Sequence, residues 1–549
     1  MLPLWEGYDE WSHFAYLQHL VDSGEMPFPD VTRPSREIQE SMWLAPVAWT
    51  LRNIGPGHLT HDSYWMLSES ERQAREQQLL AIPAESSRQQ AGGADPIYES
   101  QQPPLYYWLL YLPLKLAAGL SLPSRVFVLR CFSLALASLA IPLGFALSRR
   151  VFASEPVAVG IIALATVMPE FMIDICRVGN DSLSFLIYTL LLYLVLRMLE
   201  EPASLRSSCL LGVALACGLL TKAYFLTALP AVLLLCGWML RERWDQRRRI
   251  LAHGLFSCLL AVALSGWWYW YIHAATGTWS GQIQAAAARK VPLIEQLKAI
   301  PQVDWANAFD AILISHIWFG AASFLQVRSW MYRFFAWAFL LAVAGILLLL
   351  IKRGRTPREQ FLARKAVPAL ASVLLLFCLS LLYHVLVSFV MYKLSATNGW
   401  YISCLVFSEV ILVVLGLLAL SPAACRKWVV PAGVTCLAAL DVYGVNLLLL
   451  PYYHGLIAHA PDGKLQAFHI DQLWKTGFGE VFSRLATNRP FLGGSESFVA
   501  LWLLYLIATI ACVVVAFVQL RKYQEKDNGC FQAGSADSLR RRLGRRGGL

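Results

Sequence analysis

Two adjacent carboxylates, Asp9 and Glu10, stand near the start of the chain in the stretch WEGYDEWSHF, together with His13 and several aromatic rings. Two interpretations fit these acids. Apolar residues recur at helical spacing between residues 14 and 21, so the acids could be the negative charges that the N-terminus of a helix favours. A carboxylate beside aromatic rings could instead act as a general base that takes a proton from a hydroxyl or an amine.

A second group of polar residues interrupts the apolar part of the sequence. Arg177, Asn180 and Asp181 follow one another in CRVGNDSLSF, and Lys222 stands at the turn LLTK. Asp181 could simply cap a helix that begins at Ser182. Lys222 could extend its ammonium group to the membrane surface, or it could bind a lipid phosphate as a compact point charge. Both interpretations stay open for each residue.

These residues must be positioned by a membrane protein. Of the 549 residues, 57% are hydrophobic and only 15% are charged, and the mean hydropathy is +0.50. A helix crosses a bilayer with about 20 apolar residues. We therefore predict an all-α, polytopic helical membrane protein with about eleven transmembrane helices. The predicted spans are 126–147, 156–173, 182–199, 205–222, 223–240, 250–272, 330–351, 367–391, 400–420, 428–450 and 498–520.

The basic residues predict how these spans are oriented, because positive loops stay in the cytoplasm. If the basic tail, residues 521–549, is cytoplasmic, alternation through eleven spans brings every dense basic loop to the same side. These loops are 148–150, 200–206, 241–249, 352–365 and 425–428. Residues 1–124 then form an extracytoplasmic region with juxtamembrane helices and the acidic motif, 125–520 form the bundle, and 273–329 and 451–497 are its outer loops. Because the basic residues orient helices, we do not expect a nucleic acid as a partner.

Two helices are predicted within the first outer region. Residues 104–118 are apolar but contain Pro113 and Lys115, and counting them as a span would move the acidic motif into the cytoplasm. We expect an amphipathic helix at the outer membrane surface, with Lys115 near the headgroups and the tyrosine and tryptophan rings at the interface. A soluble helix is predicted over 68–82, where the sequence opens with a capping-box pattern.

Five short motifs follow one another in a recognisable order: DEWSHF, YESQQPPLYYW, RVGND, LLTK and TNGWY. Together they resemble those of bacterial GT-C glycosyltransferases, multi-span enzymes that use a polyprenyl-phosphate-linked sugar and are related to protein mannosyltransferases and lipid A aminoarabinose transferases. The resemblance runs from about residue 5 to about residue 455.

Two features depart from this resemblance. Relatives carry a complete transmembrane helix before the acidic motif, where this sequence has only MLPL. We expect that the start codon has been placed too far downstream or that the first helix is absent; with it, the count would be about twelve spans. Relatives also often read Gly-Arg-Tyr where this chain has Trp400, so a cation that could have touched phosphate is missing there.

The resemblance implies a hexosyl- or pentosyltransferase of the cell (inner) membrane with its active site on the extracytoplasmic side. It implies that Asp9 is the general base, with Glu10 as second candidate, and that Lys222 and Arg177 bind the phosphate of the polyprenyl-phosphate sugar donor. The other substrate-binding residues are expected to be His13, Gln102, Asn180, Asp181 and Tyr401. A single displacement would invert the anomeric centre, and the acceptor would be a lipid, a glycan or a protein.

No metal or other cofactor is expected, because one carboxylate pair and one histidine do not make a metal site. Two other classes of protein fit the composition. One is a transporter or lipid-handling protein, although the sequence shows no clear internal repeat and its polar residues gather near one face. The other is a non-catalytic scaffold with the same fold, in which the acidic motif only begins a helix.

Overall fold

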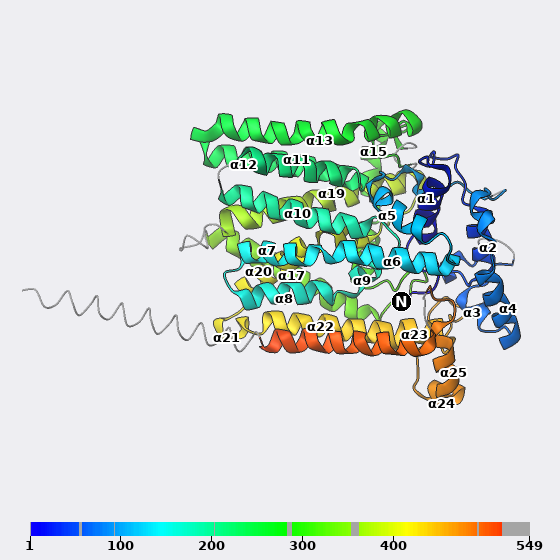
Figure 1. Cartoon of the computed structure of the whole chain (residues 1–549). Coiled ribbons are helices and arrows are strands. Elements are labelled where there is room, and N and C mark those ends of the chain that lie inside the picture. Colours follow the sequence, from blue (N-terminus) through cyan, green and yellow to red (C-terminus); the bar gives the residue numbers. More distant parts are fainter. Residues whose placement is uncertain are drawn as a thin grey trace, which may run out of the picture.

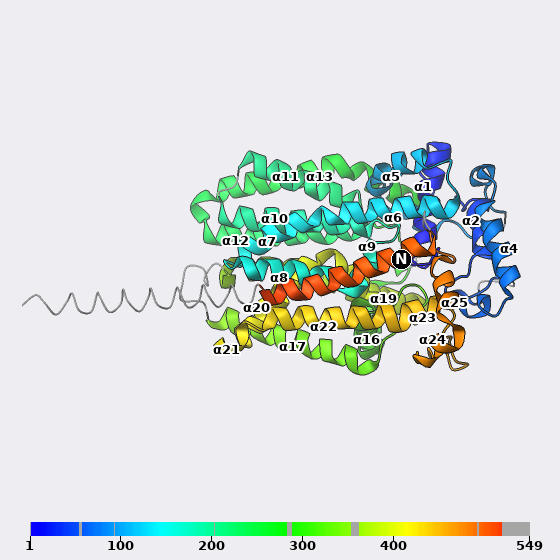
Figure 2. The same ribbon diagram turned by 60° about the horizontal axis from the view of Figure 1, so that its bottom comes forward.

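The computed structural model describes residues 2–53, 57–92, 94–201, 204–282, 288–352, 362–490 and 494–518. The regular structure in these ranges consists of helices, with only isolated β-bridges between extended residues. Long helices run side by side in one bundle, and short helices from distant parts of the chain cover one end of it (Figures 1 and 2). The predicted basic tail, residues 521–549, lies outside the described residues.

Nine helices in the described part of the chain are long and apolar enough to cross a membrane. They are Leu122–Val151 (α6 and α7), Asp181–Glu200 (α10), Ala223–Arg241 (η4 and α12), Trp244–Thr276 (η5 and α13), Ser329–Ile351 (in α17), Val367–Tyr392 (α19), Gly399–Leu420 (η8 and α20), Val429–Tyr453 (α22, η9 and α23) and Ser495–Val518. A bent pair, α8 (Glu155–Thr166) and α9 (Pro169–Ile175), makes ten if it is counted as one span, and α11 (Leu205–Leu219) is a shorter apolar helix. Every predicted span therefore coincides with a helix, and the predicted all-α membrane fold is confirmed.

The predicted span 156–173 is not the straight helix that its composition suggests. Helices α8 and α9 meet at an angle of 67°. Pro169 is the first residue of α9, where proline is well tolerated because its missing N–H would have no partner in the first turn of a helix. The break turns the chain away before it crosses the whole bundle, and it delivers the loop 176–180 to the end of the bundle that α1 covers (Figure 1).

The first outer region folds into short helices over this end of the bundle. They are α1 (Glu10–Ser23), α2 (Arg36–Leu44), α3 (His61–Tyr64), α4 (Glu69–Leu80) and α5 (Leu105–Leu116). Helix α4 begins with the predicted capping box, in which Ser68 and Glu71 each bond to the other's backbone N–H. Helix α5 has 12 residues, so it is too short to cross a bilayer, as predicted.

The expected place of the α5 rings at a lipid interface is wrong for two of them. Tyr106 and Tyr107 are fully buried in the protein. The Tyr106 hydroxyl bonds with Ser133 at 2.7 Å, and the Tyr107 ring stacks on Tyr16 with centroids 3.6 Å apart. Because α1 lies against α5, these rings face the protein, whereas Trp108 is exposed.

The three regions predicted to share the outer compartment meet at one buried carboxylate. Glu6 bonds to His61 at 2.9 Å, to the Ser323 hydroxyl at 2.9 Å and to the Tyr453 hydroxyl at 2.7 Å. Ser323 belongs to the region that contains α15 (Leu293–Ala299) and α16 (Trp305–Ile317), and Tyr453 opens the region with α24 (Asp471–Thr476) and α25 (Phe478–Ser483). The three regions therefore lie at the same end of the bundle.

Candidate active site

Four charged side chains form a buried cluster beneath α1. Arg177 Nη2 lies 2.9 Å from Asp174 Oδ1 and 2.5 Å from Asp181 Oδ2. Lys222 Nζ lies 2.5 Å from the other Asp181 oxygen, Oδ1, which also accepts a hydrogen bond from the Tyr224 hydroxyl at 3.2 Å. The structure thus brings Arg177, Asp181 and Lys222 together as the sequence predicted, and it adds Asp174.

Three breaks in helices put these charges in one place. Asp174 lies in the last turn of the bent helix α9, Asp181 is the first residue of α10, and Lys222 lies between α11 and η4. Asn180 links the last two breaks, because its Nδ2 donates to the Thr221 carbonyl at 3.0 Å and to Gln102 Oε1 at 3.1 Å. Asp181 is therefore an ion-pair partner of two cations rather than a helix cap.

Arg177 retains unused hydrogen-bonding capacity. Its side chain is 3% exposed, and its Nη1 has no hydrogen-bond partner among the described residues. Gly179 makes room for it, since a Cβ on Gly179 would lie 2.1 Å from Nη1. The backbone N–H of Gly179 donates to the Tyr106 hydroxyl at 2.9 Å, which fixes the loop around the guanidinium.

Asp9 stands next to this cluster with an unusual backbone. It precedes α1 with φ 52° and ψ 18°, in the left-handed region, and its side chain makes no capping bond. Asp9 is an exposed residue, and its carboxylate has no hydrogen-bond or ion-pair partner within the described ranges. Burial by the protein around the carboxylate raises the pKa of Asp9; Arg177 and Lys222 lower it and Asp181 raises it.

Glu10 has a different environment from its neighbour. It is fully buried, and its two oxygens accept from Arg130 Nε at 2.7 Å and Nη2 at 2.5 Å. The backbone N–H of Val178 donates to the same carboxylate at 3.0 Å. The two adjacent acids are thus divided by the structure: Glu10 fixes the loop 176–180 to α6, and Asp9 stays without a partner.

Of the other predicted substrate-binding residues, His13 packs inside the protein and Tyr401 lies beside the charged cluster. His13 is 1% exposed, its Nδ1 is 2.8 Å from the Tyr107 hydroxyl, and burial lowers its pKa well below the usual value. Its contacts therefore support packing of α1 on α5. Tyr401 lies beside the cluster, with its ring 5.5 Å from Lys222 Nζ. Its neighbour Trp400, where relatives often carry arginine, stacks on Tyr8 with centroids 3.9 Å apart.

Sequence reasoning missed Glu99, although the motif YESQQPP contains it. Glu99 is 5% exposed, its backbone N–H bonds to Ser12 Oγ at 2.9 Å, and its Oε2 has no partner among the described residues. Burial, together with the nearby charge of Asp9, raises the pKa of Glu99 to about 7. Asp174 was missed as well, because a single charge inside an apolar run gave no sign of its partners.

The described residues contain no group of three histidine, cysteine, aspartate or glutamate side chains that could hold a metal ion. The absence of a metal cofactor stays a prediction. What the arrangement offers chemically is an unpartnered carboxylate next to two cations that already share one buried aspartate.

Part of the chain that carries this site matches a protein-family model. Residues 101–270 match the family model described as dolichyl-phosphate-mannose-protein mannosyltransferase. This segment contains α5, the loop 176–180 and Lys222, but neither Asp9 nor Glu99. No curated protein matches the chain.

Two solved structures match the chain at low identity. ArnT from Cupriavidus metallidurans, bound to undecaprenyl phosphate, is 16% identical over 87% of this chain and 72% of its own, with a TM-score of 0.39. The archaeal oligosaccharyltransferase AglB from Archaeoglobus fulgidus, in complex with an inhibitory peptide and a dolichol-phosphate, is 12% identical over 85% of this chain and 53% of its own, with a TM-score of 0.41. The family match, over residues 101–270, confirms the resemblance to glycosyltransferases that the order of the motifs indicated, and it supports a multi-pass membrane glycosyltransferase.

Proposed function

We propose that this protein is a membrane glycosyltransferase that moves a sugar from a polyprenyl-phosphate donor to a lipid, glycan or protein acceptor at the extracytoplasmic face. The acceptor hydroxyl or amine attacks the anomeric carbon, and Asp9 takes its proton. The bond between the anomeric carbon and the phosphate oxygen breaks, and its electron pair stays on the phosphate. One displacement of this kind inverts the anomeric centre.

The observation that carries the proposal is the contrast between Asp9 and Glu10. A non-glycine residue in the left-handed region costs free energy and persists where the surrounding structure requires it, often at functional sites. Asp9 neither caps α1 nor pairs with a cation, so no such interaction offsets the cost of its backbone conformation. Helix stability therefore does not explain this conformation. A carboxylate that has no partner and a raised pKa suits a general base.

The cations beside Asp9 suit the leaving group. A sugar-linked polyprenyl phosphate is a diester with one negative charge, and the released monoester gains a second. Arg177 and Lys222 are balanced by Asp174 and Asp181 before donor binds, so their positive field is already oriented and needs no rearrangement. The unpartnered Nη1 of Arg177 supplies a donor hydrogen bond that the carboxylates do not use.

A transporter is the second candidate, because α8 and α9 form one interrupted helix and transporters bind ions at such breaks. The two proposals differ in whether a covalent bond breaks. The purified protein in liposomes, supplied with polyprenyl-phosphate sugars and membrane acceptors, should release polyprenyl phosphate; movement of donor without release would favour the transporter.

The same assay tests the roles of the residues. We expect Asp9→Asn to slow release by about 10²–10⁴-fold, while Asp22→Asn, a matched change at an exposed position of α1, should leave it unchanged. Nuclear magnetic resonance of the product gives the anomeric configuration, and retention would refute the single displacement. Labelling of a cysteine introduced at Asp22 with an impermeant reagent in intact cells tests the extracytoplasmic side.

A further inference from the structure

Exposed apolar side chains follow one another along α24 and α25. They are Ile470, Trp474, Phe478 and Phe482, which are 71%, 70%, 45% and 46% exposed. Residues four positions apart on a helix are neighbours, so Ile470 adjoins Trp474 and Phe478 adjoins Phe482. The rings of Trp474 and Phe478 join the two helices, with centroids 5.0 Å apart. The four side chains therefore form one continuous surface, the 470–482 patch.

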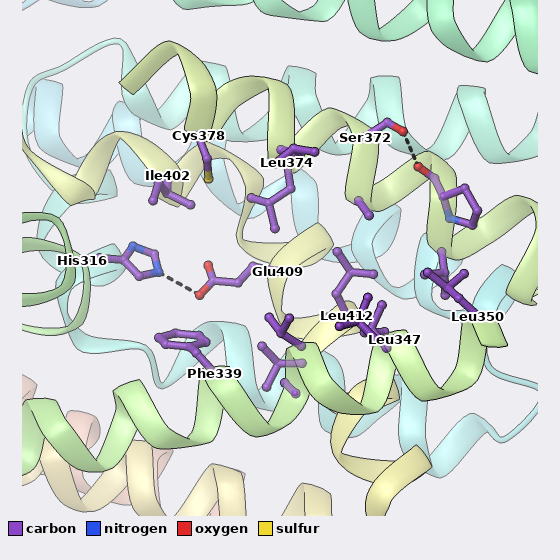
Figure 3. Close-up of a pocket in the computed structure, with 18 of the residues that line it drawn as sticks. His316, Phe339, Leu347, Leu350, Ser372, Leu374, Cys378, Ile402, Glu409 and Leu412 are labelled. Atoms are coloured by element: carbon purple, nitrogen blue, oxygen red, sulfur yellow. Dashed lines mark hydrogen bonds and ion pairs between the residues drawn. The ribbon is translucent and has the colours of Figure 1, made fainter. Parts of the chain in front are cut away.

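The two other kinds of accessible apolar surface in this protein do not explain the patch. Apolar side chains on the outer faces of the long helices meet lipid, as every membrane span requires. A cavity of about 1370 Å³ inside the bundle is lined by residues from positions 238 to 413; Figure 3 shows it around the His316–Glu409 pair, whose side chains lie 2.8 Å apart. A contiguous apolar patch outside both indicates a surface that binds a partner.

The hydrogen bonds at the end of α25 fix the patch beside the ends of two membrane spans. The hydroxyl of Ser495, the first residue of the last span, donates to the carbonyl of Ser483, the last residue of α25, at 3.4 Å. Arg484 Nη1 donates to the carbonyl of His454, which directly follows α23, at 2.8 Å. Because spans end at the bilayer surface, α25 lies at the level of the lipid head groups.

The two helices also project to the side of the bundle. Figure 1 shows α24 and α25 just past the end of α22–α23, with α24 below the lower edge of the long helices. Lipid occupies the space beside a span, so α24 overhangs the membrane surface. The patch has a polar rim that suits this place, because Asp471 and Lys475 are both exposed and form an ion pair at 2.8 Å.

We propose that the 470–482 patch binds the lipid leaflet at this end of the bundle, with its side chains between the head groups and the acyl chains. Aromatic rings with one polar edge favour this depth, and the indole N–H of Trp474 can bond to a head group while its ring stays in the apolar layer. Short amphipathic helices bind bilayers in the same way, with the apolar face buried at the boundary and the charged side chains above it.

This contact holds the segment before Asp9 at a fixed height above the bilayer. The carbonyl of Asn488 accepts a hydrogen bond from the backbone N–H of Leu4 at 2.9 Å. The Arg484 guanidinium lies 4.7 Å from the centre of the Trp65 ring. Both contacts join the region of α24 and α25 to the first outer region, so a leaflet that binds the patch also positions the short helices that cover the charged cluster.

The test introduces the photoreactive residue p-benzoylphenylalanine into the full chain, in nanodiscs of phosphatidylethanolamine and phosphatidylglycerol. Trp474→p-benzoylphenylalanine should give lipid adducts in the mass spectrum. Leu80→p-benzoylphenylalanine is the matched control, because Leu80 is 54% exposed and ends α4, which lies far from the long helices (Figures 1 and 2). Adducts at position 474 should exceed those at position 80 about tenfold, since burying one large apolar side chain favours the bilayer by about that factor.

A second measurement places the photoreactive residue at Phe482 and adds Trp474→Gln and Phe478→Gln. Both replaced rings are exposed, so the unfolding temperature should stay unchanged, and the lipid adducts should fall about tenfold or more. Three outcomes overturn the proposal: equal adducts at positions 474 and 80, adducts to a second copy of the chain in place of lipid, or adducts at position 482 that the two glutamines leave unchanged.

Discussion

Asp9→Asn and Glu10→Gln are isosteric changes at adjacent positions, and the structure predicts opposite results for them. General-base catalysis contributes about 10²–10⁴-fold, so Asp9→Asn should lower kcat by that factor. Its carboxylate has no partner within the described ranges, and a change at such a position alters the free energy of unfolding by about 0.5 kcal/mol or less. Glu10→Gln should instead leave Arg130 buried and uncompensated, at a cost of about 3–5 kcal/mol.

The assay combines initial rates of polyprenyl phosphate release with thermal unfolding in detergent. For Asp9→Asn we expect an unchanged unfolding temperature and a low rate; for Glu10→Gln we expect a lower unfolding temperature. The pH profile adds a separate check. Because a base acts when deprotonated, and burial raises the pKa of Asp9, the rate should fall with decreasing pH already above the ordinary range of an aspartate. Full activity of Asp9→Asn, or a stable but inactive Glu10→Gln, would refute this division of roles.

Three further predictions concern the neighbours of Asp9. Lys222→Gln should slow release by about 10²–10³-fold and, because Lys222 lowers the pKa of Asp9, move the acidic limb of the pH profile to higher pH; an unmoved limb would contradict this electrostatic effect on Asp9. Glu99 has a pKa of about 7, so its ionisation above that pH should raise the KM for the anionic donor in the wild type but not in Glu99→Gln, which steady-state kinetics at pH 6 and pH 8 can compare. Gly179→Ala should place a methyl group 2.1 Å from Arg177 Nη1 and so raise the KM for the donor; a wild-type KM would show that this nitrogen does not bind it.

The positions of the helices could be predicted from the sequence because a bilayer requires long apolar helices, and the run lengths report them directly. Even the close turn at Lys222 between two spans was predicted, from charge alternation. The bend at Pro169 was not predicted, because the apolar run 156–173 continues through it and composition does not report the angle between two helical segments. The burial of Tyr106 and Tyr107 was missed for a related reason: an aromatic ring is equally compatible with a lipid interface and with a protein core.

The sequence by itself determined that this chain is a multi-span helical protein, and it placed Asp9, Arg177, Asp181 and Lys222 in segments that end on one side. Those results depend on local periodicity, hydropathy and charge, which short stretches of chain contain. Only the tertiary structure decided which carboxylate is open and which is paired, since Glu10 meets its partner Arg130 across 120 positions of sequence. The His316–Glu409 pair, 93 positions apart, is of the same kind: contacts between distant residues depend on how helices pack, and no local pattern encodes them.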